Sequence, residues 1–151
     1  MARTIEGQMD ASGKRFAIVA SRWNELVTKE LVAGAQRAFR MHGGEEAHLA
    51  WVPGTWEIPV AAAEFVRKGC DAIVCVGCIL QGATIHASQL SNQVAASIAD
   101  LSLTSRVPIT WGILTCDTQE EALERAGMKL GNKGEEAAKA AIEAVSVKER
   151  I

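Results

Sequence analysis

The residue types best suited to chemistry stand together between residues 71 and 89, which read D-A-I-V-C-V-G-C-I-L-Q-G-A-T-I-H-A-S-Q. The apolar run 72–80 lacks polar alternation, as expected of a parallel strand covered on both faces. The small-residue turn Q-G-A-T follows, and apolar residues at 90, 94, 98 and 101 then mark one face of a helix. Free N–H groups and the helix dipole suit an anion at such a turn. Because His86 in the first helical turn can transfer protons near neutral pH, the stretch predicts chemistry on a phosphorylated substrate.

The same pattern has a plainer interpretation. Turns of small residues connect strands to helices in many α/β domains that bind nothing at that point, and a lone histidine is more often structural than catalytic. The stretch therefore locates a candidate site, but its spacing does not name the reaction.

Four cysteines raise the alternative of a metal or redox site. Cys75 and Cys78 form a C-x-x-C pair. Because the pair lies inside the predicted strand, an offset of three residues directs the two side chains to opposite faces. No second C-x-x-C or C-x-x-H completes a zinc site, and Cys70 and Cys116 stand alone near strand ends. We therefore predict reduced thiols that serve as small core residues, with no metal.

Length and charge limit the class of protein. The 151 residues suit one domain, 1–151, that is large enough to bury a core. Charged residues make up 23% of the chain and the formal net charge is −2, so no nucleic-acid or membrane partner is predicted. No apolar run approaches the roughly 20 residues of a membrane helix. The N-terminal M-A-R-T-I-E-G-Q lacks the apolar core of a signal peptide, which predicts a cytoplasmic protein.

Strand and helix patterns alternate along residues 14–151. Strands are expected at 15–20, 47–52, 72–80 and 109–116. Helices are expected at 25–41, 58–68, 86–101 and 118–126. A Gly- and Lys-rich loop at 127–134 precedes a final helix that runs to the C-terminus. The polar residues 21–24, Thr55, and Asp117 or Thr118 are expected to cap helices. This order predicts the α/β class: a three-layer αβα sandwich around a flavodoxin-like four-stranded parallel sheet.

Residues 1–13 form a short arm ahead of this core. Ile5 is the only large apolar residue between Met1 and Met9, so the arm can bury little against its own domain. An extended segment of this kind is suited to pairing with the edge of a neighbouring subunit's sheet, where its backbone groups find partners. We therefore predict a short N-terminal arm strand.

Ligands of open α/β sheets bind outside the carboxyl ends of the strands. Trp23 and Trp56 both stand in segments that leave those ends, and Glu57 follows as a hydrogen-bond acceptor. Together with the anion turn they predict an aromatic slot for a flat heterocycle. A lid on the core or a subunit contact is the alternative role for each tryptophan. Arg125 and Lys133 are the remaining cations of interest, but spacing alone does not bring them to the site.

Six blocks of the sequence resemble the lumazine synthase family, in the family's order and near its spacing. They are F-A-I-V-A-S-R-W-N, V-P-G-T-W-E-I-P-V-A-A, V-G-C-I-L-Q-G-A-T-I-H, P-I-T-W-G-I-L-T, T-Q-E-E-A-L-E-R-A-G and G-N-K-G-E-E-A-A. The resemblance implies a transferase of riboflavin biosynthesis that condenses 5-amino-6-ribitylaminouracil with 3,4-dihydroxy-2-butanone 4-phosphate and needs no cofactor. It also implies a homo-oligomer: a pentamer, which in some members builds an icosahedral shell of 60 subunits.

The resemblance further implies roles for individual residues. His86 matches the proton-transfer histidine, Arg125 matches an arginine that reaches the phosphate from the neighbouring subunit, and Ala83 and Thr84 match the phosphate cradle. A larger set matches the family's residues that hold the pyrimidine and its ribityl chain: Trp23, Thr55, Trp56, Glu57, Cys78, Ile79, Leu80, Lys133 and Trp111. Of these, Trp111 matches a residue that enters from the neighbouring subunit. Imine formation and phosphate loss need proton transfer and charge stabilisation, which an imidazole and a guanidinium supply.

The central motif departs from the family pattern. The family usually reads G-x-T-P-H-F, whereas this chain reads G-A-T-I-H-A. Ile85 stands in place of a proline suited to the first helical turn, and Ala87 in place of an aromatic residue, so we expect retained binding and slower turnover. Two alternatives stay open. One is a homologue with weakened catalysis that binds lumazine or flavin or builds a shell. The other is a generic nucleotide binder, although S-R-W-N after the first strand would make a poor phosphate-binding loop.

Overall fold

The computed structural model describes residues 2–82 and 85–151. Its main sheet is parallel, with the strand order β2-β1-β3-β4. The strands are β1 (Phe16–Ser21), β2 (His48–Val52), β3 (Ala72–Leu80) and β4 (Ile109–Cys116). Strand β3 pairs with both β1 and β4, and all its residues but the last are buried. This central position explains why its sequence shows no polar alternation.

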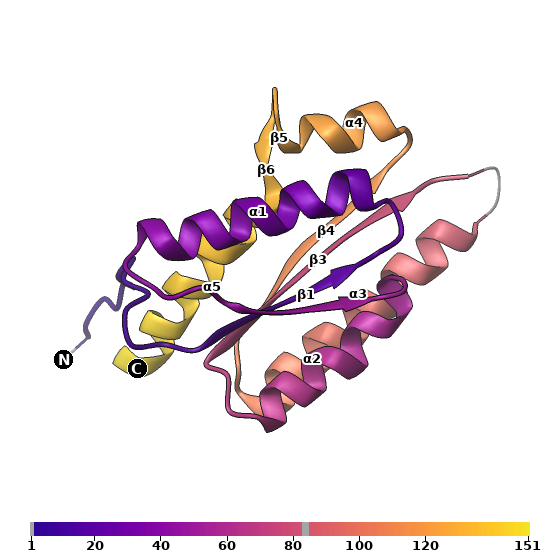
Figure 1. Ribbon diagram of the computed structural model, residues 1–151. Coiled ribbons are helices and arrows are strands. Elements are labelled where there is room, and N and C mark those ends of the chain that lie inside the picture. Colours follow the sequence, from indigo (N-terminus) through magenta and orange to yellow (C-terminus); the bar gives the residue numbers. More distant parts are fainter. Residues whose placement is uncertain (1, 83–84) are drawn as a thin grey trace.

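Helices cover both faces of the sheet. They are α1 (Glu25–Met41), α2 (Ile58–Arg67), α3 (His86–Ser105), α4 (Gln119–Glu124) and α5 (Lys133–Arg150). Figure 1 shows α1 and α5 on one face, and α2 and α3 on the other. The predicted three-layer α/β fold is therefore confirmed. Across the described part of the chain, no helix is both long and apolar enough to cross a membrane.

Each face of the sheet has its own hydrophobic core. Ile18 and Val74 face α1 and α5, whereas their neighbours Val19 and Ile73 face α2 and α3. Successive residues of a strand point to opposite sides, so the same two strands contribute to both cores. The sheet is thereby fixed on both faces, and the loops at its carboxyl ends start from rigid positions.

The cysteines lie in these cores as free thiols, as predicted from their spacing. Cys75 belongs to the core beneath α2 and α3, and Cys78 to the core beneath α1 and α5. Burial raises the pKa of the Cys75 thiol to about 12. Burial also raises the pKa of the Cys78 thiol to about 11, with a smaller contribution from the neighbouring Cys116 thiol. Both thiols stay protonated at neutral pH and are poor nucleophiles.

The element boundaries agree closely with the predicted ones, but two helix caps differ. Thr55, expected to cap α2, instead begins the 3-10 turn η1 (Thr55–Glu57) that leads into α2. The Asn24 side chain stands at the start of α1 but does not cap it, because its amide donates to the Cys78 carbonyl oxygen instead. At α4 the prediction is right, since the Thr118 hydroxyl accepts a hydrogen bond from the Glu121 N–H at 3.2 Å.

A short antiparallel hairpin occupies part of the predicted loop at 127–134. It consists of β5 (Ala126–Met128) and β6 (Gly131–Asn132). Gly127 and Gly131 adopt φ values of 110° and 82°, which glycine accepts without strain. The strands are too short to give an alternating pattern, which is why the sequence predicts only a loop. Figure 1 shows that the hairpin and α4 stand at the β4 side of the molecule.

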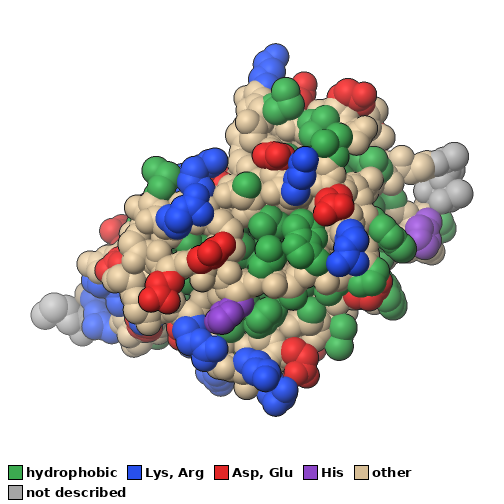
Figure 2. All heavy atoms as spheres, in the orientation of Figure 1, with side chains coloured by type: hydrophobic (Ala, Val, Ile, Leu, Met, Phe, Trp, Pro, Cys, Tyr) green, Lys and Arg blue, Asp and Glu red, His purple; other side chains and the backbone are tan. Residues whose placement is uncertain are grey.

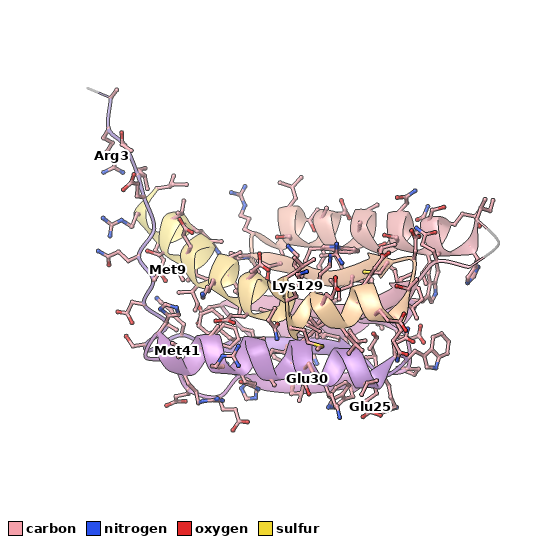
Figure 3. The ribbon with its side chains drawn as sticks, turned by 90° about the horizontal axis from the view of Figure 1, so that it is seen from above. Arg3, Met9, Glu25, Glu30, Met41 and Lys129 are labelled. Atoms are coloured by element: carbon pink, nitrogen blue, oxygen red, sulfur yellow. The ribbon has the colours of Figure 1, made fainter. Side chains whose placement is uncertain are left out.

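Helices α1 and α5 run side by side, as Figures 1 and 3 show. At their closest approach a Cβ on Gly134 would overlap the carbonyl oxygen of Leu31 and lie 2.8 Å from its Cα. Beside this contact the Asn132 side chain joins the two helices: its Nδ2 donates to the Glu30 carbonyl oxygen at 2.9 Å, and its Oδ1 accepts from the Glu135 N–H at 3.0 Å. Glycine at 134 is therefore a packing requirement.

Replacing Gly134 with alanine is expected to lower the free energy of unfolding by about 3 kcal/mol, because the new methyl group forces two packed backbones apart. Urea unfolding followed by tryptophan fluorescence measures the change. Gly82→Ala is the control, since a Cβ at Gly82 meets no heavy atom of the described residues within 4 Å. An unchanged unfolding midpoint for Gly134→Ala would show that the helices can separate without loss.

The N-terminal arm lies along α5 of its own chain. The Gln8 N–H donates to the Ser146 hydroxyl at 2.8 Å, and Gly7 packs directly against α5 because it has no side chain. Figure 3 shows Arg3 and Met9 on this arm, beside the C-terminal end of α5. Most arm residues stay exposed, and none of residues 2–13 is in a strand. The predicted pairing of the arm with a neighbouring sheet therefore remains a prediction.

Candidate functional site

The order of strands in the sheet reverses between β1 and β3. From β1 the chain first moves outward to β2. It then returns through α2 to β3, on the other side of β1, and continues through α3 to β4. The loops that leave β1 and β3 turn in opposite directions and leave a crevice between them. This crevice contains a cavity of about 260 Å³, here termed the crevice cavity. Its walls are Ser21, Trp23, Asn24, Thr55, Cys78, Ile79, Leu80, Gly82, His86, Ala87 and Leu90.

The crevice cavity brings together a large part of the predicted site. The predicted residues that line it are Trp23, Thr55, Cys78, Ile79, Leu80 and His86. They come from the ends of β1 and β3, from η1 and from the first turn of α3. The predicted phosphate cradle, Ala83 and Thr84, lies outside the described residues. The cavity walls are mainly apolar, as expected of a site for a flat ring.

Trp23 stands at this cavity in a turn that the backbone fixes. The Trp23 N–H donates to the Pro53 carbonyl oxygen at 3.1 Å, and the Arg22 N–H donates to the Val52 carbonyl oxygen at 2.7 Å. The indole packs on Gly54, where a Cβ would come within 2.8 Å of ring atom Cε3. The side chain is nevertheless 68% exposed. A supported indole with an open surface is suited to stacking on a heterocycle.

Asn24 explains how that turn is held against the sheet. Its φ of 64° lies in the left-handed region, which asparagine tolerates better than most residues. Its Nδ2 donates to the Cys78 carbonyl oxygen at 2.8 Å, so the side chain connects the end of β1 to the end of β3. The two strand ends that frame the crevice are thereby fixed to each other. The polar segment 21–24, predicted to cap α1, therefore uses its asparagine to hold the two strand ends together.

Ile85 and Ala87 flank His86 at the start of α3. Ala87 is 5% exposed and lines the crevice cavity, so a phenyl ring at this position would fill part of the cavity. Ile85 is exposed and has a φ of −76°, which a proline ring accepts. The small Ala87 side chain therefore leaves open space in the crevice cavity, and the backbone at residue 85 already has the conformation that a proline would impose.

Trp56 and Glu57 do not line the crevice cavity. Trp56 is 64% exposed and lines a separate pocket of about 220 Å³ between α2 and α3. Glu57 is half-buried at the start of α2. The single chain therefore does not bring Trp23 and Trp56 into one aromatic slot. The turn η1 separates them, because it directs Thr55 inward and Trp56 outward.

Trp111, Arg125 and Lys133 gather in a different cavity, at the outer edge of β4. This second cavity, the edge cavity, has a volume of about 360 Å³ and also contains Glu121. The Arg125 Nη1 donates to the Glu121 carbonyl oxygen at 2.9 Å, which fixes the guanidinium. The Lys133 ammonium lies 3.4 Å from the exposed Glu136 carboxylate, a weak pairing at the surface. Two cations in a polar cavity are suited to an anion.

The two cavities have complementary chemistry. The crevice cavity offers an apolar wall, an indole and an imidazole, which can hold a ring and transfer a proton. The edge cavity offers a guanidinium and an ammonium, which can hold a phosphate. Trp111 in the edge cavity is 39% exposed and lies on β4, which among the described strands pairs with β3 alone. Each cavity thus holds part of a site for a ring and a phosphate.

Comparison with known proteins covers nearly the whole chain. The family model for 6,7-dimethyl-8-ribityllumazine synthase matches residues 13–149. A relative of that name from Aquifex aeolicus (strain VF5) is 50% identical over 141 residues, which cover 91% of this chain and 92% of the relative. The matched region includes every element of the sheet and both cavities. The chain belongs to the 6,7-dimethyl-8-ribityllumazine synthase family.

Proposed function

We propose that this protein condenses 5-amino-6-ribitylaminouracil with 3,4-dihydroxy-2-butanone 4-phosphate to 6,7-dimethyl-8-ribityllumazine, and releases phosphate and water. One observation carries the proposal: Trp23 and His86 both line the crevice cavity, in a chain that belongs to this family. The cavity supplies a stacking surface and a proton-transfer group within one crevice. No metal or organic cofactor has a part in the proposed reaction.

The pyrimidine is proposed to occupy the crevice cavity. Its ring stacks on Trp23 and lies against the end of β3 at Cys78, Ile79 and Leu80. Thr55, which also lines the cavity, and Glu57, at the start of α2, are proposed to hold the ribityl chain and its amine. The protonated Cys78 thiol adds a small apolar surface and no negative charge, which suits a neutral ring.

His86 is proposed to transfer the protons. Imine formation removes water, and ring closure follows the loss of phosphate, so a group that both accepts and releases a proton near neutral pH is required. His86 stands at the N-terminal end of α3 and lines the crevice cavity. Holding both substrates beside this imidazole removes much of the entropic barrier to their reaction.

The phosphate is proposed to bind Arg125 of a second copy of the chain, together with Ala83 and Thr84 of the first. In the single chain, Arg125 lines the edge cavity and His86 the crevice cavity. Placing the edge cavity of one copy over the crevice cavity of another unites a cation with the imidazole, and brings Trp111 and Lys133 to the ring. The proposed site is therefore shared between subunits.

A shared site requires a homo-oligomer, which we propose to be at least a pentamer, in the cytoplasm. Figure 2 shows hydrophobic side chains gathered on the face where β2 passes beside α1, and Leu49 of β2 is 39% exposed. An apolar edge strand of this kind is suited to pairing with the arm of a neighbour. A shell of 60 subunits is the larger assembly of the same contacts. Light scattering tests the assembly, and a monomer would exclude the shared site.

The activity is tested by mixing the purified protein with both substrates and following lumazine by its absorbance and fluorescence. The proposal predicts turnover with release of one phosphate for each lumazine formed. The alternative is a binding or shell-forming homologue with weakened catalysis, which the departures at Ile85 and Ala87 favour. Binding of the pyrimidine without turnover would support that alternative.

A further inference from the structure

The Ser21 side chain carries a buried hydroxyl with no hydrogen-bond partner in the part of the chain that the structure describes. Ser21 is the last residue of β1 and is 1% exposed. Its Oγ forms no hydrogen bond within the described residues. Most buried polar groups in folded proteins are paired, because an unpaired one loses its hydrogen bonds to water without replacement. An unpaired hydroxyl at the wall of a ligand cavity therefore has a candidate partner in the ligand.

The position of Ser21 supports this assignment. Alternation along β1 places its side chain on the α2–α3 face, with Ala17 and Val19, and Ser21 lines the crevice cavity. Gly77 of β3 stands beside it: a Cβ there would lie 2.9 Å from the Ser21 Oγ and 2.8 Å from the Thr55 Cγ2. The absence of a side chain at Gly77 makes room for the hydroxyl between the two strand ends. The wall next to it is otherwise mainly apolar.

We propose that Ser21 is a positioning residue for the pyrimidine, and that its hydroxyl donates a hydrogen bond to an acceptor on the edge of the ring that stacks on Trp23. Rotation of a serine about χ1 moves its Oγ among three staggered positions without moving the backbone, so the hydroxyl can turn toward a ring in the cavity. The inference rests on the proposed function, because the ring is that of ribitylaminouracil. A group that recognises the ring edge favours this heterocycle over apolar rings of the same shape.

Thr28 provides a matched control. It carries another buried hydroxyl without a hydrogen-bond partner in the described part of the chain. It lies in α1, is 0% exposed and does not line the crevice cavity. Removing either hydroxyl relieves the same unfavourable burial, but only Ser21 stands where a ligand can reach it.

The test measures the binding of 5-amino-6-ribitylaminouracil alone, by calorimetric titration of the unaltered protein, Ser21→Ala and Thr28→Val. Ser21→Ala is expected to raise Kd about tenfold, the effect of one lost hydrogen bond. Thr28→Val is expected to leave Kd unchanged. Both variants are expected to melt at or above the temperature of the unaltered protein, because each removes an unpaired polar group. In the turnover assay, Ser21→Ala raises KM for the pyrimidine and leaves kcat within about twofold.

Three outcomes overturn the inference. Equal Kd values for Ser21→Ala and the unaltered protein overturn it and leave the proposed function intact. A rise in Kd that Thr28→Val shares also overturns it, because the loss would then come from packing. Failure of the unaltered protein to bind ribitylaminouracil overturns both this inference and the proposed function.

Discussion

Replacing Arg125 with alanine is expected to lower kcat/KM for the butanone phosphate about a thousandfold, which corresponds to about 4 kcal/mol. Arg125 lines the edge cavity, and its bond to the Glu121 carbonyl oxygen uses one of the five guanidinium N–H donors. The bond fixes the guanidinium and leaves its other N–H donors available for the proposed contact with the phosphate. The charge on a departing phosphate grows during the reaction, so the guanidinium stabilises the transition state more than the bound substrate. Steady-state kinetics with each substrate varied in turn measure the effect.

Two further variants separate this role from a general loss of positive charge. Arg125→Lys keeps the charge but loses the planar fork, so a loss of about tenfold to a hundredfold is expected. Lys129→Ala removes an exposed cation from the nearby β5–β6 turn, labelled in Figure 3, which does not line the edge cavity. It should leave both KM values unchanged. A loss of less than about threefold for Arg125→Ala would exclude a direct contact with the phosphate.

Replacing His86 with alanine is expected to lower kcat about a hundredfold, the lower end of the range for a general acid–base group. KM for the pyrimidine should change little, because the ring is proposed to stack on Trp23 and to lie against the end of β3, which the variant leaves intact. His86→Gln, which keeps a polar side chain but cannot titrate near neutral pH, should be equally slow. His42→Ala is the control, since His42 lies at the far end of α1 and does not line the crevice cavity.

The two outcomes for His86 distinguish two sources of rate. A large fall in kcat assigns the main contribution to proton transfer. An unchanged kcat for His86→Ala would contradict that role, and the rate would then come from holding the two substrates side by side.

The parts of the fold that the sequence predicts best are those with a strong pattern. The apolar run 72–80 could only be a covered strand, and its position at the centre of the sheet confirms this. The caps were less predictable, because a polar residue before a helix has several possible partners. Asn24 bonds across to β3, and Thr55 turns inward. Such choices depend on neighbours that are distant in the sequence.

In the candidate site, too, residues that follow a strong sequence pattern were predictable, and residues that depend on distant neighbours were not. Trp23 and His86 could be assigned to one crevice, because both follow strands that flank the switch point of the sheet. Arg125 could not be placed from spacing, since it lies beyond β4, between the short helix α4 and a hairpin whose strands are too short for a clear pattern. Ser21 was missed as a site residue because one small polar residue at the end of an apolar strand gives no signal. Its missing hydrogen bond becomes visible only in three dimensions.

The claim that one site is shared between two subunits is tested most directly by combining two inactive variants. His86→Ala subunits have an intact edge cavity, and Arg125→Ala subunits have an intact crevice cavity. When the two variants are produced together in equal amounts and assemble at random in a ring, about half of the sites have an intact crevice cavity, and about half of those face an intact edge cavity. About a quarter of all sites are therefore complete. We predict that the mixed assembly recovers about a quarter of the unaltered activity. A mixture no more active than either variant alone would show that His86 and Arg125 do not meet across a subunit interface.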